Sequence, residues 1–114
     1  MNSSDNVLVF KALANSVRLK IIDTLLDGPK SVESIRIRVG EAQSRVSHEL
    51  FCLRNCGFVK PRRSGKMIIY ELNKTSVTPI LSAANKHASL FCKELKSCNI
   101  LSEIKENARS IYNK

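Results

Sequence analysis

The stretch that decides the fold of this chain reads Ser44-Arg45-Val46-Ser47-His48-Glu49-Leu50-Phe51-Cys52-Leu53-Arg54-Asn55-Cys56-Gly57-Phe58-Val59. Val46, Leu50 and Leu53 fall on one side of a helix, and Gly57 ends that helix before an apolar entry into a strand. The first half carries small polar and basic side chains, which suit base edges and phosphates. The second half carries two cysteines four residues apart. The stretch therefore predicts one helix with a DNA-reading end and a thiol-bearing end.

A shorter predicted helix precedes this one. Ser31 can cap its start, Ile35 and Val39 share its apolar side, and Gly40 ends it. Two short helices joined by a turn that contains glycine form a helix-turn-helix. This arrangement places the second helix in the major groove of DNA.

Two further helices are predicted upstream of the helix-turn-helix. The first ends at residues 10–14, and Asn15 with Ser16 can cap the second. The sequence Asp-Gly-Pro at residues 27–29 stops the second helix. Four apolar side chains of the second helix are expected to face the core: Leu19, Ile22, Leu25 and Leu26.

A basic hairpin is predicted after the reading helix. Residues 58–62 and 67–72 have the pattern of strands, and residues 63–66 connect them. Pro61 confines its strand to a sheet edge because proline lacks a backbone donor. Such a hairpin after a helix-turn-helix is a wing. Its basic side chains are expected to meet phosphates or the minor groove: Arg62, Arg63 and Lys66.

The C-terminal third has the pattern of a dimerisation helix. Apolar residues alternate in steps of four and three over three heptads: Val77, Leu81, Ala84, Ala88, Phe91, Leu95 and Cys98. This seam predicts one long helix that faces a second copy of the chain, with packing back onto its own domain as the alternative. A weaker apolar stripe over residues 101–111 predicts an added helical segment.

Length and composition favour one folded domain over residues 1–114. The expected fold class is mainly α with a small β-hairpin, a winged helix-turn-helix with N- and C-terminal dimerisation helices. No apolar run reaches the length of a membrane span, and no signal peptide pattern opens the chain, so we expect a cytoplasmic protein with no membrane partner. Four cysteines in such a compartment favour ligands or sensors over structural disulfides.

The charge of the chain is concentrated where the reading helix and the wing are predicted. The net charge is +9, and residues 30–66 hold nine basic and three acidic side chains. This is the pattern of a protein that binds a polyanion. The expected partner is double-stranded DNA. The expected contacts on the reading helix are Gln43, Ser44, Arg45, Ser47 and His48.

Several strings of residues carry a family resemblance over about residues 10–72. They are Phe10–Ala14, Arg18–Ile22, Gln43–Leu50, Leu53–Val59, and Gly65-Lys66 with Tyr70 and Leu72. Together they resemble the ArsR/SmtB family of metal-responsive winged-helix repressors. The resemblance implies a homodimeric repressor. One departure is Ala42, where the family often has a capping serine.

The positions of the cysteines resemble the cadmium- and lead-sensing subtype of that family. In that subtype two cysteines lie late in the recognition helix, and a third comes from the C-terminal region of the partner subunit. Cys52 and Cys56 match the first two positions. The resemblance implies Cys98 as the third ligand, with Cys92 in reserve.

The spacing of the cysteine pair also favours metal chemistry. Cβ atoms at positions i and i+4 of a helix lie about 5–6 Å apart, which strains a disulfide but leaves two sulfurs free to share an ion. Thiolates prefer soft ions such as Cd(II), Pb(II) or As(III), and a nearby cation such as Arg54 would favour the thiolate form. A thiol redox sensor, and a winged-helix protein with no effector, remain alternatives. No enzyme motif is visible, so catalysis is not expected.

Overall fold

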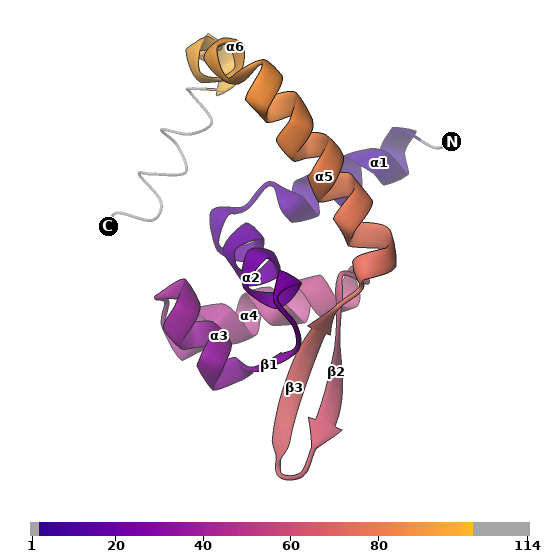
Figure 1. Ribbon diagram of the computed structural model, residues 1–114, viewed down its shortest axis with the longest axis vertical. Coiled ribbons are helices and arrows are strands. Elements are labelled where there is room, and N and C mark those ends of the chain that lie inside the picture. Colours follow the sequence, from indigo (N-terminus) through magenta and orange to yellow (C-terminus); the bar gives the residue numbers. More distant parts are fainter. Residues whose placement is uncertain (1–2, 102–114) are drawn as a thin grey trace. The chain divides into compact units, whose positions relative to one another are not determined.

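The computed structural model describes residues 3–101, and Figure 1 shows their helices and strands. The chain divides into two compact units between Thr78 and Pro79. The elements are α1 (Ser3–Leu13), α2 (Ser16–Leu26), β1 (Lys30–Ser31), α3 (Val32–Val39), α4 (Gln43–Asn55), β2 (Val59–Ser64), β3 (Met67–Leu72), α5 (Lys74–Leu90) and α6 (Cys92–Ser97). The predicted winged helix-turn-helix is confirmed.

The predicted helix caps form where the sequence placed them. The Asn15 side chain accepts a hydrogen bond from the backbone N–H of Arg18 at 3.0 Å and begins α2. Ser31 accepts one from the backbone N–H of Ser34 at 3.1 Å and begins α3. Gly40, at φ +76°, ends α3 in the left-handed conformation that glycine tolerates best. Ala42 precedes α4 without a side-chain cap, as its methyl group requires.

The core of the first unit forms where the helix-turn-helix packs against α2 and the sheet. Its fully buried members come from α2, α3, α4 and the start of α5: Ile21, Ile22, Leu25, Ile35, Val46, Leu50, Leu53 and Val77. The prediction for α2 was half right. Ile22 and Leu25 are buried, but Leu19 is only half-buried and Leu26 is exposed. Val17 and Ile21 are buried instead of Leu19 and Leu26, so the buried side of α2 is rotated by about one residue relative to the prediction.

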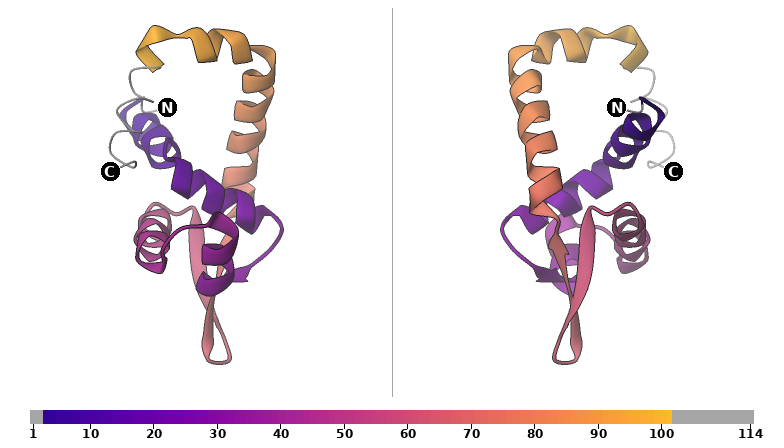
Figure 2. Two further views of the ribbon diagram at one scale, coloured as in Figure 1. Left: turned by 90° about the vertical axis from the view of Figure 1, so that its left-hand side faces the viewer. Right: turned by 90° about the vertical axis from the view of Figure 1, so that its right-hand side faces the viewer.

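The sheet has three antiparallel strands in the order β1-β3-β2. Pairing of β2 with β3 runs from Val59 opposite Leu72 to Ser64 opposite Met67. Strand β3 has the predicted bounds, whereas β2 continues two residues further toward the turn than predicted. The edge position predicted from Pro61 is confirmed. Figure 2 shows this hairpin projecting beyond the helices of the first unit. The short strand β1 was not predicted, since two residues carry no periodicity.

The predicted continuous C-terminal helix is wrong. It breaks at Phe91, where φ is −125° and ψ is 30°, and α6 ends before Cys98 (Figure 2). The Ser89 hydroxyl donates to the Lys86 carbonyl at 2.9 Å, and serine contacts of this kind weaken and bend helices. Val77, the first residue of the predicted seam, is fully buried rather than available to a partner. The stripe predicted over residues 101–111 lies, beyond Leu101, outside the described residues.

No helix among residues 3–101 is both long and apolar enough to cross a bilayer.

Candidate DNA-reading helix and thiol pair

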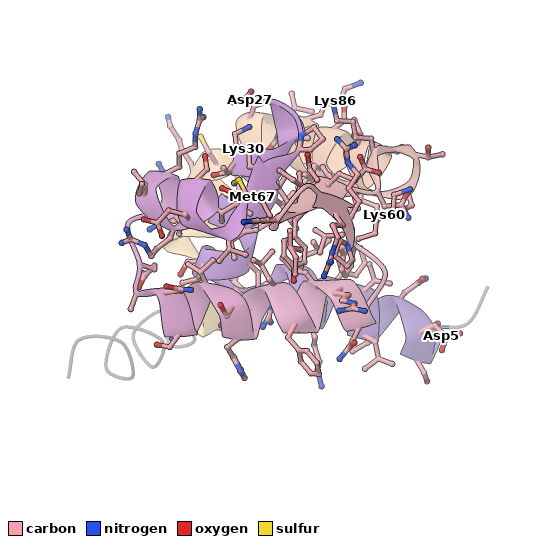
Figure 3. The ribbon with its side chains drawn as sticks, turned by 90° about the horizontal axis from the view of Figure 1, so that it is seen from below. Asp5, Asp27, Lys30, Lys60, Met67 and Lys86 are labelled. Atoms are coloured by element: carbon pink, nitrogen blue, oxygen red, sulfur yellow. The ribbon has the colours of Figure 1, made fainter. Side chains whose placement is uncertain are left out.

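One side of α4 is buried and the opposite side faces solvent. Val46, Leu50 and Leu53 fix the buried side. Figure 3 shows side chains of α4 pointing away from the rest of the first unit. The exposed residues of α4 include four of the five predicted contacts together with three that were not predicted: Gln43, Ser44, Ser47, His48, Phe51, Arg54 and Asn55. Small polar groups and an imidazole on an exposed helix face can donate to and accept from base edges.

Arg45 differs from the other predicted contacts. Its Nε donates to Oε2 of Glu49 at 2.9 Å, one turn further along α4. Its side chain is 30% exposed, so it lies on the flank of the reading face rather than at its centre. In the absence of DNA, the predicted groove contact Arg45 is therefore paired with the buried carboxylate of Glu49.

The wing carries its charge unevenly. Lys60 Nζ and Arg62 Nε lie 3.3 Å and 3.7 Å from the carboxylate of Glu71 on the neighbouring strand. Arg63 and Lys66 are exposed and form no ion pair with any described residue. Since Glu71 offsets part of the charge of Arg62, Arg63 and Lys66 are the wing cations most available to a phosphate. Figure 3 shows Lys60 and Met67 on this hairpin.

Cys52 and Cys56 lie together at the end of α4. The two thiols lie one helical turn apart, with Cys52 half-buried and Cys56 exposed. Burial raises the pKa of the Cys52 thiol, while the positive charge of Arg18 lowers it. The cation acting on this thiol is therefore Arg18 of α2 and not the predicted Arg54. Two sulfurs one helical turn apart, one of them accessible to solvent, are suitable donors for a soft ion.

Glu49 and Arg18 were missed by the sequence analysis. Glu49 is 3% exposed, and its Oε1 accepts from Nη1 of Arg18 at 2.9 Å. Arg18 also donates from Nε to the Ala12 carbonyl at 2.6 Å and from Nη2 to the Lys11 carbonyl at 3.3 Å. A signal was present, because Glu49 falls on the apolar stripe of α4. An acidic residue on a buried stripe requires a cationic partner.

The other two cysteines belong to the second unit. Cys92 is exposed and begins α6, whereas Cys98 is half-buried and follows α6. All four cysteines lie within the described range and carry thiols rather than disulfides. Within residues 3–101, no three histidine, cysteine or acidic side chains gather as a metal-binding group. The ring of His87 stacks on that of Phe91, with ring centroids 4.8 Å apart.

Comparison with known proteins places this geometry in one family. Residues 15–60 match the model of the arsR family of bacterial regulatory proteins. The chain is 41% identical over 78 residues to the transcriptional regulator NmtR of Mycobacterium tuberculosis, covering 68% of this chain and 65% of NmtR. It is 33% identical over 87 residues to the cadmium resistance regulatory protein CadC homologue of Staphylococcus aureus, covering 75% of this chain and 72% of the relative. The chain belongs to the ArsR family.

Solved structures agree with this ArsR assignment. HlyU of Vibrio cholerae superposes with a TM-score of 0.67 at 34% identity, covering 80% of this chain and 96% of HlyU. A homodimeric winged helix-turn-helix fragment of Mb0332 from Mycobacterium bovis gives a TM-score of 0.67 at 31% identity, with coverage of 77% and 83%. Members of the ArsR family are DNA-binding transcriptional regulators. This protein is therefore a DNA-binding transcriptional regulator and not an enzyme.

The match to the ArsR family model spans α2, α3, α4 and the start of β2. The exposed side of α4, the candidate reading face, therefore lies within the matched region. The thiol pair lies at the end of the same helix, so a ligand at the thiols would bind to the helix that carries the candidate reading face.

Proposed function

We propose that this chain is a repressor that leaves its operator when a soft metal or metalloid ion binds Cys52 and Cys56. The observation that carries the proposal is the placement of these two thiols one turn apart at the end of α4, with Cys52 half-buried and Cys56 exposed. Thiolates select Cd(II), Pb(II) or As(III) over hard ions such as Mg(II). A relative named for cadmium resistance supports the same class of effector.

We further propose that the third ligand is Cys98, contributed by the partner subunit of a homodimer. Two thiolates leave such an ion short of donors, and no third donor joins the pair within the described residues. Cys98 is half-buried at the end of α6. Cys92, the reserve, is exposed at the start of α6.

Dimer formation would use the exposed apolar side chains of the terminal helices. On α1 these are Val7, Leu8 and Phe10, which are 51%, 64% and 61% exposed. In the second unit they include Leu90 and Phe91. Burial of such side chains is favourable at roughly 25 cal/mol per Å² of apolar area. Two-fold symmetry then calls for an operator of two inverted half-sites.

A titration of reduced protein on its own promoter DNA tests the effector. We expect Cd(II), Pb(II) or As(III) to weaken DNA binding by about 5- to 150-fold, the usual range for allosteric coupling. Thiolate-to-metal charge-transfer absorption should grow with binding. Both effects should vanish in the double variant Cys52→Ser, Cys56→Ser. Release of DNA by metal in that variant would place the sensing site elsewhere.

Mixed dimers test the origin of the third ligand. One subunit carries Cys98→Ser, and its partner carries Cys52→Ser with Cys56→Ser. A ligand from the partner leaves one intact metal site in this heterodimer. A ligand within one chain leaves none. A full response in the Cys98→Ser homodimer would instead assign the role to Cys92 or to the thiol pair alone.

A thiol redox switch is the second candidate. The accessible Cys56 beside Cys52 would be the site of first oxidation. Treating the metal-free protein with hydrogen peroxide distinguishes the two candidates. A redox switch loses DNA binding under peroxide and recovers it with dithiothreitol, without any metal.

A further inference from the structure

A buried ion network lies beside the thiol pair on α4. The Glu49 carboxylate uses both oxygens, with Oε1 accepting from Arg18 and Oε2 from Arg45, each at 2.9 Å. Arg18 lies in the first turn of α2, and its guanidinium group also donates hydrogen bonds to the carbonyl groups of Ala12 and Lys11 at the end of α1. The thiol ligands and the exposed groove contacts of α4 include neither Arg18 nor Glu49.

One end of the network reaches the thiols. Glu49 and Cys52 are three residues apart on α4, so their side chains lie on neighbouring turns of the same side. Arg18 Nη1 lies 2.9 Å from Oε1 of Glu49, so the guanidinium group of Arg18 lies beside the part of α4 that carries Cys52. A change of charge at Cys52 would therefore act on the contact between Arg18 and Glu49.

The other end of the network reaches the reading face. Arg45 is four residues before Glu49 and lies in the half of α4 that carries Ser44 and Ser47. Two guanidinium groups share one carboxylate, which leaves the network with a net charge of +1. This net positive charge can attract either a thiolate near Arg18 or a DNA phosphate near Arg45.

We propose that the network of Arg18, Glu49 and Arg45 couples the thiol pair to DNA binding, an inference that rests on the proposed function. When Cd(II) or Pb(II) binds, Cys52, Cys56 and Cys98 of the partner subunit each release a proton to water and form a metal–sulfur bond, so that three thiolates and one divalent ion carry a net charge of −1. This net negative charge beside Cys52 draws Arg18 away from Glu49. Because Glu49 is 3% exposed, water cannot replace the lost contact, and the carboxylate holds Arg45 more strongly. Arg45 then gives less charge to the DNA backbone.

The variant Glu49→Gln tests this coupling. Glutamine keeps the shape of the side chain and one hydrogen-bond acceptor, but it removes the negative charge that attracts both Arg18 and Arg45. We expect unchanged Cd(II) affinity by charge-transfer absorption and unchanged or tighter DNA binding without metal. Metal-driven release should fall from at least about fivefold to less than about twofold. The matched control is Glu33→Gln, which removes an exposed carboxylate paired with Arg36 on α3 and should leave release intact.

A second measurement keeps the test decisive if Glu49→Gln fails to fold. Side-chain NMR signals of isotope-labelled arginine report the Nε–H groups of Arg18 and Arg45 in the full-length protein. Both signals should shift on Cd(II) addition in the absence of DNA. Arg18→Lys, which keeps the charge, should retain part of the release that Arg18→Gln loses.

The outcomes separate the two proposals. Full metal-driven release in Glu49→Gln at wild-type metal affinity, or an Arg45 signal that does not respond to Cd(II), would overturn the coupling alone. Absence of any release in the wild-type protein would instead contradict the proposed function.

Discussion

At the scale of single residues, α4 separates its tasks by side. Val46, Leu50 and Leu53 hold the helix in the core, whereas Phe51 is 64% exposed on the opposite side. Cys52 and Cys56 lie between these two sides, next to the buried Glu49. A substitution on this helix should therefore affect stability, DNA binding or thiol chemistry according to the side on which it falls.

Truncating Leu53 should lower the stability of the fold. Leu53→Ala removes a side chain with no exposure, and such changes cost about 2–5 kcal/mol through lost burial and a residual cavity. Phe51→Ala is the matched control on the same helix and should change stability by less than about 0.5 kcal/mol. Urea unfolding followed by circular dichroism gives both values. Equal losses would show that Phe51 is buried in solution.

The thiol pair should react in a fixed order. Burial raises the pKa of Cys52, so the folded state favours its protonated form and its thiolate forms at higher pH than an ordinary thiol. By linkage, this thiol opposes folding as the pH rises through the ordinary thiol range. At about pH 8, iodoacetamide should modify Cys56 before Cys52. Trypsin cleaves after Arg54, so mass spectrometry measures each cysteine on its own peptide. Equal rates would contradict this order.

At the scale of elements, the wing and the reading helix supply different kinds of contact. The exposed face of α4 is polar and lightly charged, whereas the hairpin is rich in cations. Glu71 takes up part of the charge of Lys60 and Arg62, while Arg63 and Lys66 have no acidic partner among the described residues. The hairpin is therefore suited to phosphates and α4 to base edges.

Removing the unpaired wing cations should reduce the salt dependence of DNA binding. Each phosphate contact adds about 0.9 to the slope of log K against log salt, so Arg63→Ala with Lys66→Ala should lower that slope by nearly two. Lys60→Ala with Arg62→Ala, which removes two cations already paired with Glu71, should lower it less. Fluorescence anisotropy at several salt concentrations measures both variants. An equal effect of the two pairs would contradict the role assigned to Glu71.

Most elements could be predicted from sequence because their signals are local. The caps at Asn15 and Ser31, the turn at Gly40 and the edge position of Pro61 depend on chemistry within a few residues. The break at Phe91 was missed because the heptad pattern continues across the position at which the backbone leaves the helical conformation. The partners of Glu49 were missed because Arg18 is 31 residues away, and no local pattern pairs them.

At the scale of the whole molecule, function is proposed to require two copies. The predicted seam of the C-terminal region cannot act as one coiled coil, since the helix breaks and Val77 is used internally. The exposed apolar residues of α1 offer a second surface that a dimer can bury. We therefore expect α1 to form a substantial part of the dimer interface.

A charge on α1 should weaken the dimer. Leu8→Glu places a carboxylate at a side chain that is 64% exposed, where the folded subunit tolerates it but a buried interface does not. Ile37→Glu, also 64% exposed but on α3, is the matched control and should leave the dimer unchanged. Sedimentation velocity at micromolar concentration measures the oligomer, and circular dichroism checks the fold. A dimer that survives Leu8→Glu would exclude this face of α1 from the interface.

The two-residue strand β1 joins the wing hairpin to the helix-turn-helix. Lys30 and Ser31 pair with Tyr70 and Ile69 of β3, and α3 begins at the next residue, Val32. The hairpin is thus paired directly to the start of the helix-turn-helix, and we expect the two to tilt together. A tilt that the effector induces would change the distance and angle between the two half-sites, in addition to the loss of charge from Arg45 within each half-site. We expect an operator with one or two base pairs inserted at its centre to lose affinity even without the effector, because the spacing of its half-sites no longer matches that of the two reading helices.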